Sequence, residues 1–370
     1  MIKNLIIAGK NNIAIEITQY VLDTFPSLKV YTLFNDNDDT IDTGWQSSFK
    51  KYCLSEPRLH CIDLEQSYNI DNSIFLSLEF DKIIEPSQFL TNKIYNIHFS
   101  FLPEYRGVYT SALPLLHGKK FSGVTLHEID KGIDSGRIIA QWSINLSTVV
   151  NAGQLYSIYC FYGAFLLKES LPSLFKNVVF SKKQNDLNSS YYSRSSINYR
   201  DVNLNIDCSA EELLCQVKAL TFRQFQLPTF NGYQISSAKI TNINSKSRNE
   251  EEIDDTEPYI LVHTNTYFVM LIKDRFQSLI QSIEDRNEFK WKKIVKQNPS
   301  LVLEVDEVGN NPIRLAIALG DSQLLSFLLE RAVLFESFKC FQNEFQFLID
   351  GYTRRSQDNA LYELYCKFLS

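Results

Sequence analysis

The residues with the clearest chemical potential in this 370-residue chain lie in the stretch YNIHFSFLPEYRGV, which begins at Tyr95. Asn96 and His98 are two residues apart in an apolar run, so in a strand they face the same way. The imidazole has an ordinary pKa of about 6.5 and exchanges protons near neutrality. The asparagine amide can donate a hydrogen bond to an oxygen that becomes negative during a reaction. The pair therefore offers a proton acceptor and an oxyanion donor.

A third chemical group, Asp134, follows 36 residues after His98 in the segment DKGIDSGRI. It lies between glycines at a predicted turn, where a carboxylate can point into a cleft. A carboxylate beside a histidine orients the imidazole and raises its basicity. Each residue alone has a structural explanation, but the three together, with no adjacent serine or cysteine nucleophile, suit acyl transfer to an external amine. We interpret His117 and His127 as structural or peripheral.

The elements around these residues alternate between strand and helix patterns up to about residue 180. Such alternation predicts an open α/β sheet of the Rossmann-like kind. Sites in these sheets form at the carboxyl ends of the strands, which is where Asn96 and His98 fall. The predicted strands cover residues 4–9, 29–36, 72–80, 93–100, 122–130 and 136–146, and the predicted helices cover residues 12–25 and 152–175.

We predict three domains: residues 1–185 with the catalytic candidates, a small α+β subdomain at 186–275, and a helical region at 276–370. In the second, Ser209 and Glu212 form a capping-box pattern that opens a helix. The hairpin pattern that follows either pairs two copies of the chain or packs on its own domain. In the third, the sequence GNNPIRLAIALGDSQLLSFLLERA resembles a degraded ankyrin repeat.

Composition excludes several classes of function. The net charge of -6 and the pI of about 5.5 argue against tRNA or DNA as the main partner. No apolar run has the length of a signal peptide or of a membrane span. The seven cysteines are scattered without a C-x-x-C pair, which indicates reduced thiols, a cytoplasmic protein and no metal site.

The combined pattern resembles that of the 10-formyltetrahydrofolate-dependent formyltransferases. That family carries Asn-x-His-x-Ser-x-Leu-Pro-x-x-Arg-Gly followed by Gly-(Ile/Leu)-Asp-(Ser/Thr)-Gly. Here NIHFSFLPEYRG and GIDSG match the two parts in order. The resemblance implies that Asn96, His98 and Asp134 are catalytic and that 10-formyltetrahydrofolate is the co-substrate. It also implies that the formyl carbon and the pterin lie in the cleft that the three residues line.

The start of the chain, IIAGKNNIAIEITQYVLD, resembles the branch of the family that acts on nucleotide-linked amino sugars. The segments YYSRSSINYRD, SAEELLCQVKALTF and LPTFNGYQI resemble the part of the same branch that receives the nucleotide sugar. From this resemblance we expect arginines to pair with the pyrophosphate and aromatic rings to stack on the base. The expected substrate contacts are Lys10, Asn11, Arg106, Tyr191, Tyr192, Arg194 and Phe222, with Arg200 as a further pyrophosphate candidate. The expected folate contacts are Phe80, Ile83, Ile84, Leu102, Asp130 and Gly132.

The expected reaction is formyl transfer from 10-formyltetrahydrofolate to a dTDP-linked amino-dideoxyhexose, most simply dTDP-3-amino-3,6-dideoxy-glucose or -galactose, for O-antigen and lipopolysaccharide synthesis. We expect a homodimer, and the ankyrin-like tail, with Trp291, is a candidate site for a second nucleotide. Two alternatives stay open: an enzyme like methionyl-tRNA formyltransferase, and an ankyrin-type interaction protein on a formyltransferase fold. The sugar configuration, its 3- or 4-amino position and the choice of dTDP or UDP are also open.

Overall fold

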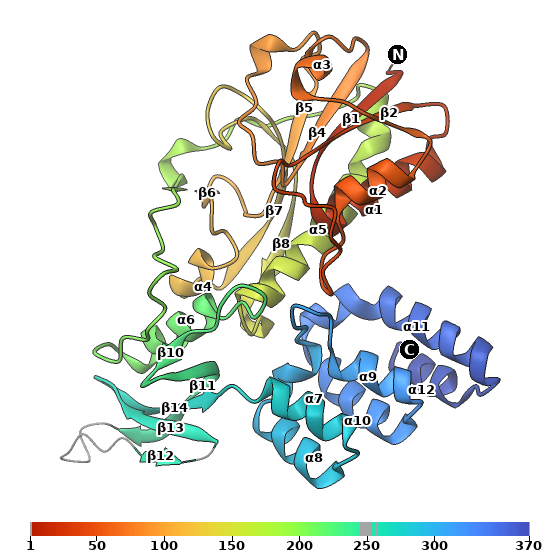
Figure 1. Ribbon diagram of the computed structural model, residues 1–370. Helices are drawn as coiled ribbons and strands as arrows, with labels where there is room; N and C mark the ends of the chain where they lie inside the picture. Colours follow the sequence, from red (N-terminus) through yellow and green to blue (C-terminus); the bar gives the residue numbers. More distant parts are fainter. Residues whose placement is uncertain (1, 245–253, 257, 370) are drawn as a thin grey trace. The chain divides into compact units, whose positions relative to one another are not determined.

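The computed structural model describes residues 2–244, 254–256 and 258–369, and the chain divides into two compact units (Figure 1). The first unit comprises Met1–Thr110, Phe121–Ile144 and Tyr159–Ile197. The second unit comprises Ser111–Lys120, Asn145–Ile158 and Asn198–Ser370. The three domains with boundaries at residues 185 and 275 stay a prediction.

The first unit is built on a seven-stranded sheet in the order β3-β2-β1-β4-β5-β7-β8. From β3 to β5 the neighbouring strands are parallel, and β7 runs antiparallel to β5. The predicted open α/β fold with a parallel core is thereby confirmed. Its strands are β1 (Asn4–Gly9), β2 (Lys29–Phe34), β3 (Leu59–Cys61), β4 (Ser73–Leu78), β5 (Ile94–His98), β7 (Phe121–Glu128) and β8 (Ile138–Asn145).

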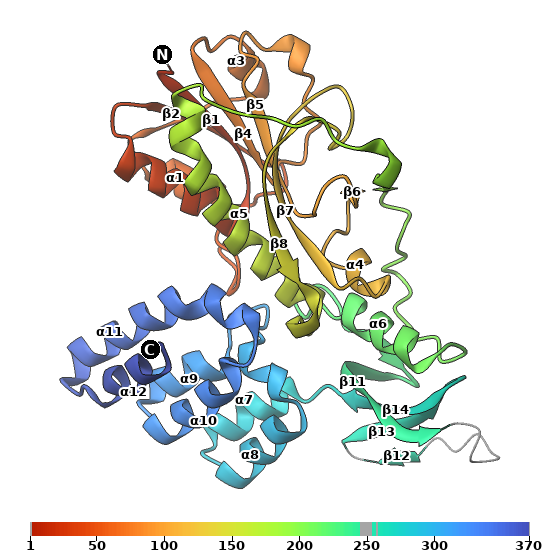
Figure 2. The same ribbon diagram turned by 180° about the vertical axis from the view of Figure 1, so that it is seen from behind.

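Helices α1 (Asn11–Thr24) and α5 (Ala152–Phe175) lie side by side on one face of this sheet (Figure 2). Gly163 makes the close approach possible, because a Cβ there would lie 3.1 Å from Ile97 and 3.2 Å from Ile13. The shorter helices α2 (Phe49–Ser55) and α3 (Leu64–Tyr68) follow β2 and β3. A two-stranded pair, β6 (Arg106–Gly107) with β9 (Tyr191–Tyr192), lies apart from the main sheet.

The second unit contains a five-stranded sheet in the order β10-β11-β14-β13-β12. The predicted hairpin is its antiparallel pair β13 (Tyr259–His263) and β14 (Tyr267–Lys273). The sequence did not predict β11 (Tyr233–Asn244), whose register with β14 is broken twice. The remaining elements are β10 (Thr229–Phe230), β12 (Asp254–Thr256), α4 (Leu113–Leu116) and α6 (Ala210–Leu220), and α6 opens with the predicted capping box.

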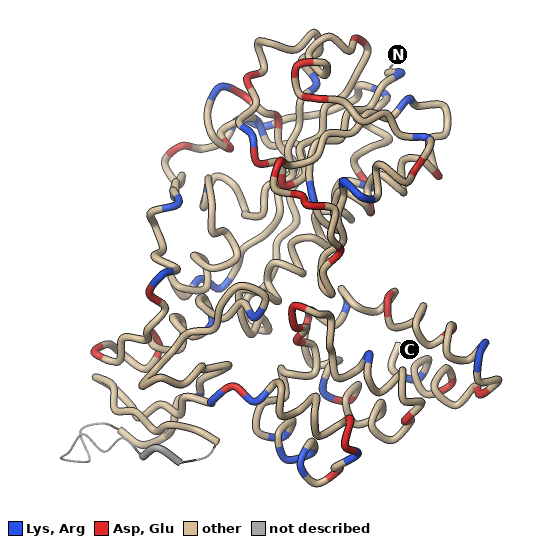
Figure 3. The backbone as a smooth tube through the Cα atoms, in the orientation of Figure 1, with Lys and Arg blue, Asp and Glu red and all other residues tan. Residues whose placement is uncertain are grey.

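Residues of both charge signs are interspersed along the described parts of the backbone in each unit (Figure 3). Among the described residues there is no long run of basic residues that could bind along a nucleic-acid backbone, and the net charge of the chain is -6. None of the helices that the structure describes has the length and apolar character of a membrane-spanning segment.

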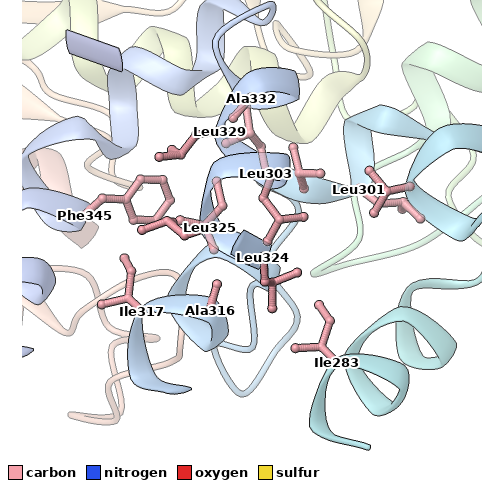
Figure 4. Packing of buried hydrophobic residues seen from close by; sticks show 14 of the residues in the cluster. Ile283, Leu301, Leu303, Ala316, Ile317, Leu324, Leu325, Leu329, Ala332 and Phe345 are labelled. Atoms are coloured by element: carbon pink, nitrogen blue, oxygen red, sulfur yellow. The ribbon is translucent and has the colours of Figure 1, made fainter. Parts of the chain in front are cut away.

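The tail is a stack of short helices around one hydrophobic core (Figure 4). Asn311 caps one helix by accepting hydrogen bonds from two backbone N–H groups, and Gly320 ends it in the left-handed conformation with a φ of 68°. The helices are α7 (Phe276–Glu284), α8 (Glu288–Gln297), α9 (Pro312–Leu319), α10 (Ser322–Ala332), α11 (Gln342–Ser356) and α12 (Ala360–Leu369). The predicted helical tail is confirmed, whereas its identity as an ankyrin repeat stays a prediction.

A buried ionic network joins the tail to the rest of the second unit. The Arg223 guanidinium donates to both oxygens of Asp274, at 3.0 and 2.6 Å, and its Nε donates to Glu304 at 3.3 Å. The other oxygen of Glu304 accepts from the Asn151 amide at 2.7 Å. Removing Arg223 would leave the buried carboxylates of Asp274 and Glu304 without their cation. The tail is therefore part of the second unit's fold and not an independent appendage.

Candidate active site

The structure brings Asn96, His98 and Asp134 together at the carboxyl end of β5. Asn96 and His98 project from this strand on the same side, as their spacing predicts. The loop after β7 carries Asp134, whose Oδ2 lies 3.5 Å from His98 Nδ1. The side chain of His98 is 8% exposed and that of Asp134 is 14% exposed, so water screens their interaction only weakly.

The two ring nitrogens of His98 face different partners. Nε2 lies 2.8 Å from the carbonyl oxygen of Tyr105. Because a carbonyl can only accept, His98 Nε2–H must donate, and this hydrogen bond selects the tautomer. The sequence interpretation gave this role to Asp134, but the structure gives it to the Tyr105 backbone. Nδ1 is then the ring nitrogen that can accept a proton. This nitrogen is the one that lies beside Asp134.

The charges of the pair follow from burial and from their partners. Burial lowers the pKa of His98, and the Asp134 carboxylate and the Tyr105 carbonyl offset this effect only in part. Burial alone raises the pKa of Asp134, but His98, His127 and the Gly107 N–H outweigh it and hold that pKa below its ordinary value. Near neutral pH the site therefore holds a neutral imidazole next to an ionised carboxylate, which is the state that a general base requires.

His127, which the sequence analysis interprets as structural or peripheral, has a structural role inside the site. The antiparallel register of β5 and β7 sets it opposite Asn96. Its Nδ1–H donates to the Glu128 carbonyl at 2.7 Å, so its Nε2 accepts from the Asn96 amide at 3.1 Å. Its Nε2 also lies 3.6 Å from Asp134 Oδ1. His127 thus orients the Asn96 amide, and only the strand register reveals this contact.

The loop around Asp134 is held by short-range hydrogen bonds. Asp134 adopts a left-handed backbone with a φ of 51°, a conformation that non-glycine residues seldom occupy. Its carboxylate accepts from the Gly107 N–H at 2.9 Å. Asp130 Oδ1 accepts from the Gly132 N–H at 3.0 Å and from the Ser135 hydroxyl at 2.7 Å. The Asp130 carboxylate, a predicted folate contact, is therefore engaged in shaping the loop that carries Asp134.

Two predicted substrate contacts lie at the start of α1, and a third is already engaged within the protein. Lys10 is the N-cap residue of α1, and Asn11 follows it with a φ of 62°. Arg106 donates to Gln184 Oε1 and to Asp186 Oδ1, so its guanidinium fixes the segment after α5. A pyrophosphate contact through Arg106 would have to share these bonds.

The predicted aromatic contacts differ in their exposure. Tyr191 is 56% exposed, and Tyr192 stacks on Tyr105 with ring centroids 5.4 Å apart. Phe222 belongs to the second unit, is 8% exposed and packs against Phe225. Its ring is thus part of a core and has little surface left for stacking on a base. Arg194, the other predicted pyrophosphate partner, is exposed.

The predicted folate contacts that follow β4 and β5 also divide by burial. Ile83 is 84% exposed, whereas the side chains of Ile84 and Leu102 are 8% and 1% exposed. The last two can therefore offer a ligand little beyond their backbone. Phe80 lines a cavity of about 340 Å³ together with Leu33, Phe34, Ile62 and Lys82, among others. No cluster of three or more His, Cys, Asp and Glu side chains within the described ranges is arranged to hold a metal ion.

Comparisons with known proteins place this geometry in a family. The family model described as "Formyl transferase" matches residues 65–159, which include all three predicted catalytic residues. The methionyl-tRNA formyltransferase of Staphylococcus aureus is 27% identical over 216 residues, which are 57% of this chain and 69% of that protein.

Two solved structures are more similar. One is an N-formyltransferase from Helicobacter canadensis in complex with folinic acid and dTDP-3-aminofucose. The other is WlaRD, a sugar 3N-formyl transferase, in the presence of dTDP and 5-N-formyl-THF. Each is 36% identical with a TM-score of 0.67, and the match covers 74% of this chain and 100% or 98% of the other. At this identity over almost the full length of both solved proteins and about three quarters of this chain, the chain belongs to the sugar N-formyltransferases.

Proposed function

We propose that this enzyme transfers a formyl group from 10-formyltetrahydrofolate to the 3-amino group of a dTDP-linked 3-amino-3,6-dideoxyhexose. The observation that carries the proposal is the match, at 36% identity, to two proteins solved with formyl-folates and dTDP or a dTDP-3-amino sugar. The buried His98–Asp134 pair and the oriented Asn96 amide supply the chemistry that this transfer needs. A role in the synthesis of O-antigen or another lipopolysaccharide sugar is part of the proposal.

The proposed reaction begins with the neutral amine of the sugar, which attacks the formyl carbon. The new carbon–nitrogen bond forms, and the formyl oxygen becomes an oxyanion that accepts a hydrogen bond from Asn96. The Asn96 amide has two hydrogens. One of them is donated to His127 Nε2, and the other is left for the oxygen of the substrate. Loss of one oxyanion donor typically lowers the rate by roughly 10²–10³.

In the proposed proton transfer, His98 acts through Nδ1, because its Nε2–H is bound to the Tyr105 carbonyl. Nδ1 takes the proton from the attacking amine, and Asp134 stabilises the imidazolium that results. His98 then returns the proton to the folate nitrogen as its bond to the formyl carbon breaks. Tetrahydrofolate and the N-formylated sugar nucleotide leave, and no covalent enzyme intermediate is needed.

The test is a panel of dTDP- and UDP-linked 3-amino and 4-amino sugars, each incubated with 10-formyltetrahydrofolate. Mass spectrometry identifies the sugar that gains one formyl group, and we expect a dTDP-3-amino sugar to react fastest. Failure of every dTDP-3-amino sugar, with formylation of a UDP- or 4-amino sugar, would refute the substrate assignment. We expect His98→Asn to lose most turnover while it still binds folate, and near-normal turnover would refute the role of His98.

We place the folate next to Phe80, where the described cavity has apolar lining residues and one cation, Lys82, in its lining. A pocket of a few hundred Å³ is the size that small cofactors occupy. Phe80→Asp should raise the KM for 10-formyltetrahydrofolate without a change in the KM for the sugar nucleotide. An unchanged KM for the folate would remove this cavity from the proposal.

We place the sugar nucleotide against Lys10, Asn11, Tyr191 and Arg194. The backbone turn that carries Asn11 and the exposure of Tyr191 and Arg194 support these contacts. Arg194→Ala should raise the KM for the sugar nucleotide, because a guanidinium pairs with pyrophosphate through charge-assisted hydrogen bonds. An equal KM in the variant would contradict the assignment.

We also propose that the enzyme is a homodimer and that its ankyrin-like tail holds a second nucleotide. A cavity of about 410 Å³ in the tail supports the second site, with Arg286, Lys292, Trp291 and Phe327 among its lining residues. Because Arg286 is exposed, Arg286→Glu should leave the fold intact and reduce the number of dTDP molecules bound in calorimetry from two to one. A single dTDP per chain in the parent protein would contradict the second site.

The similarity to methionyl-tRNA formyltransferase supports a second candidate function, formylation of initiator tRNA. The net charge of -6 disfavours it, since tRNA binding depends on cationic side chains that neutralise phosphates. Filter binding with initiator methionyl-tRNA separates the two functions. Tight, salt-dependent binding with formyl transfer to the tRNA would favour the second candidate.

A further inference from the structure

Residues 181–192, which we call the strap, run from the edge of the central sheet to the turn beside His98. At one end, the Lys182 backbone exchanges two hydrogen bonds with Ile138 on the edge strand β8, at 2.8 and 2.7 Å. At the other end, β9 pairs with β6, and the Tyr192 carbonyl accepts from the Val108 N–H at 3.0 Å. The sequence predicts only a polar surface segment here, but the structure fixes it at both ends.

Gln184 is the buried centre of the strap, with 5% of its surface exposed. Its Nε2 donates to the backbone carbonyls of Asp134 and Gly136, both at 2.8 Å. Its Oε1 accepts from Arg106 Nε at 3.1 Å and from Arg106 Nη2 at 2.7 Å. Both amide hydrogens and both oxygen lone pairs are therefore used. The reversed amide would set its oxygen against two carbonyl oxygens, so only this orientation satisfies the site.

Ser190 holds the other half of the site. Its hydroxyl accepts from the Tyr105 N–H at 2.8 Å, and its carbonyl accepts from the Arg106 N–H at 2.8 Å. Tyr105 has a left-handed backbone with a φ of 60°, and its own carbonyl receives the His98 Nε2–H. The strap thus contacts the residue that selects the tautomer of His98 and the backbone of Asp134.

Left-handed conformations of non-glycine residues cost of order 1–3 kcal/mol each and persist only where the surroundings enforce them. The strap meets this requirement at Tyr105 and at Asp134. We propose that Gln184 and Ser190 are positioning residues for formyl transfer, which set the distance and orientation between His98 Nδ1 and the Asp134 carboxylate. This inference rests on the proposed catalytic roles of His98 and Asp134.

Gln184→Glu is the sharpest test, because it keeps the side-chain length and the acceptor for Arg106 but replaces the two donors by a carboxylate oxygen. We expect kcat to fall about tenfold or more with little change in KM, because misplacement of a catalytic group by about 1 Å can cost 10²-fold. For Ser190→Ala, which adds no charge near His98, we expect the acidic limb of kcat/KM to move to lower pH, since the Tyr105 carbonyl is held less firmly against His98 Nε2–H. Asp186→Asn is the matched control: Asp186 also contacts Arg106, at 3.1 Å, but makes none of the hydrogen bonds described above to Asp134, so the variant should leave kcat unchanged.

Circular dichroism and thermal melting establish that each variant is folded. If Gln184→Glu does not fold, Ser190→Ala tests the same strap, because it removes only the hydroxyl that accepts from Tyr105, and we expect about a threefold or greater loss of kcat. If a folded Gln184→Glu or Ser190→Ala variant turns over within about twofold of the parent enzyme, the inference is overturned. A loss of turnover in Ser190→Ala without a shift of the acidic limb of kcat/KM also overturns it.

The same measurements on His98→Asn and Asp134→Asn separate this inference from the proposed function. If those two variants keep their turnover, the proposed catalytic roles fail and the strap has nothing to position. If they lose turnover while the Gln184 and Ser190 variants do not, only the positioning role of the strap is wrong.

Discussion

The negative charge of Asp134 should control the pKa of His98, and the structure allows the size of their interaction to be worked out. Asp134→Asn keeps the shape of the side chain and removes a negative charge 3.5 Å from His98 Nδ1. At an effective dielectric constant of about 20, two unit charges at this distance interact by about 5 kcal/mol. This attraction favours the protonated imidazole, so the carboxylate raises the pKa of His98.

The sign of the pH effect follows from the protonation state that the reaction needs. Burial lowers the pKa of His98 and Asp134 raises it, so the substitution lowers it further. The base must be neutral to accept a proton, and activity therefore rises as pH passes through this pKa. In Asp134→Asn the rising limb moves to lower pH. The plateau of kcat/KM above this limb falls by about 10²–10⁴-fold, which is the usual contribution of a general base.

The assay follows the release of tetrahydrofolate and gives kcat/KM as a function of pH. It covers the pH range in which the parent enzyme and Asp134→Asn are both folded. The limb set by the substrate amine serves as an internal reference, because the substitution does not change the substrate. Equilibrium folate binding shows whether the site is otherwise intact. A rising limb at the same pH in both proteins, or a plateau within about threefold of the parent, would refute the proposed coupling of Asp134 to His98.

Three further predictions concern other parts of the molecule. His127→Leu should lower kcat by about tenfold with unchanged folate affinity in titrations, because the catalytic amide loses the acceptor that orients it. Gly107→Ala should lower both Tm and kcat, since the new Cβ would lie 2.1 Å from the Tyr192 carbonyl oxygen and the φ of 94° is restricted to glycine; an unchanged Tm contradicts this. Arg223→Ala should reduce the free energy of unfolding in urea by about 3 kcal/mol, because Asp274 and Glu304 lose their shared cation in a buried site; a loss under about 1 kcal/mol contradicts it.

The central strand and its two catalytic candidates were predictable because their signals are local. A strand imposes a repeat of two, so the spacing of Asn96 and His98 places both on one side whatever surrounds them. The apolar runs of the parallel sheet and the capping box at Ser209 are local in the same sense. The match of the whole pattern to a known family then connects Asp134 to the pair.

The partners of these residues were not predictable, because they depend on register and on contacts between distant segments. His127 meets Asn96 through the pairing of β5 with β7, across 31 residues of sequence. Gln184 reaches the carbonyl of Asp134 across 50 residues. Nothing in the letters HEID or KKQNDL distinguishes these side chains from surface residues.

Burial was the second property that residue types alone did not reveal. Phe222 and Tyr191 are both aromatic candidates for stacking on a base, yet one is 8% exposed and the other 56%. Neighbouring Ile83 and Ile84 differ in the same way, at 84% and 8%. The side of a loop on which a residue falls is decided by the packing of the whole unit, and a single sequence records no trace of that packing.

The sequence by itself thus determined the candidate catalytic groups, because their types and spacing follow from covalent order and the period of a strand. Only the tertiary structure decided how they are held. It put the proton of His98 on Nε2 through the Tyr105 carbonyl, turned the Asn96 amide through His127 and anchored Asp134 through Gln184. Each of these contacts is made by hydrogen bonds between residues that are separated in the sequence. Their geometry exists only once the sheet, the loop and the strap have folded against one another.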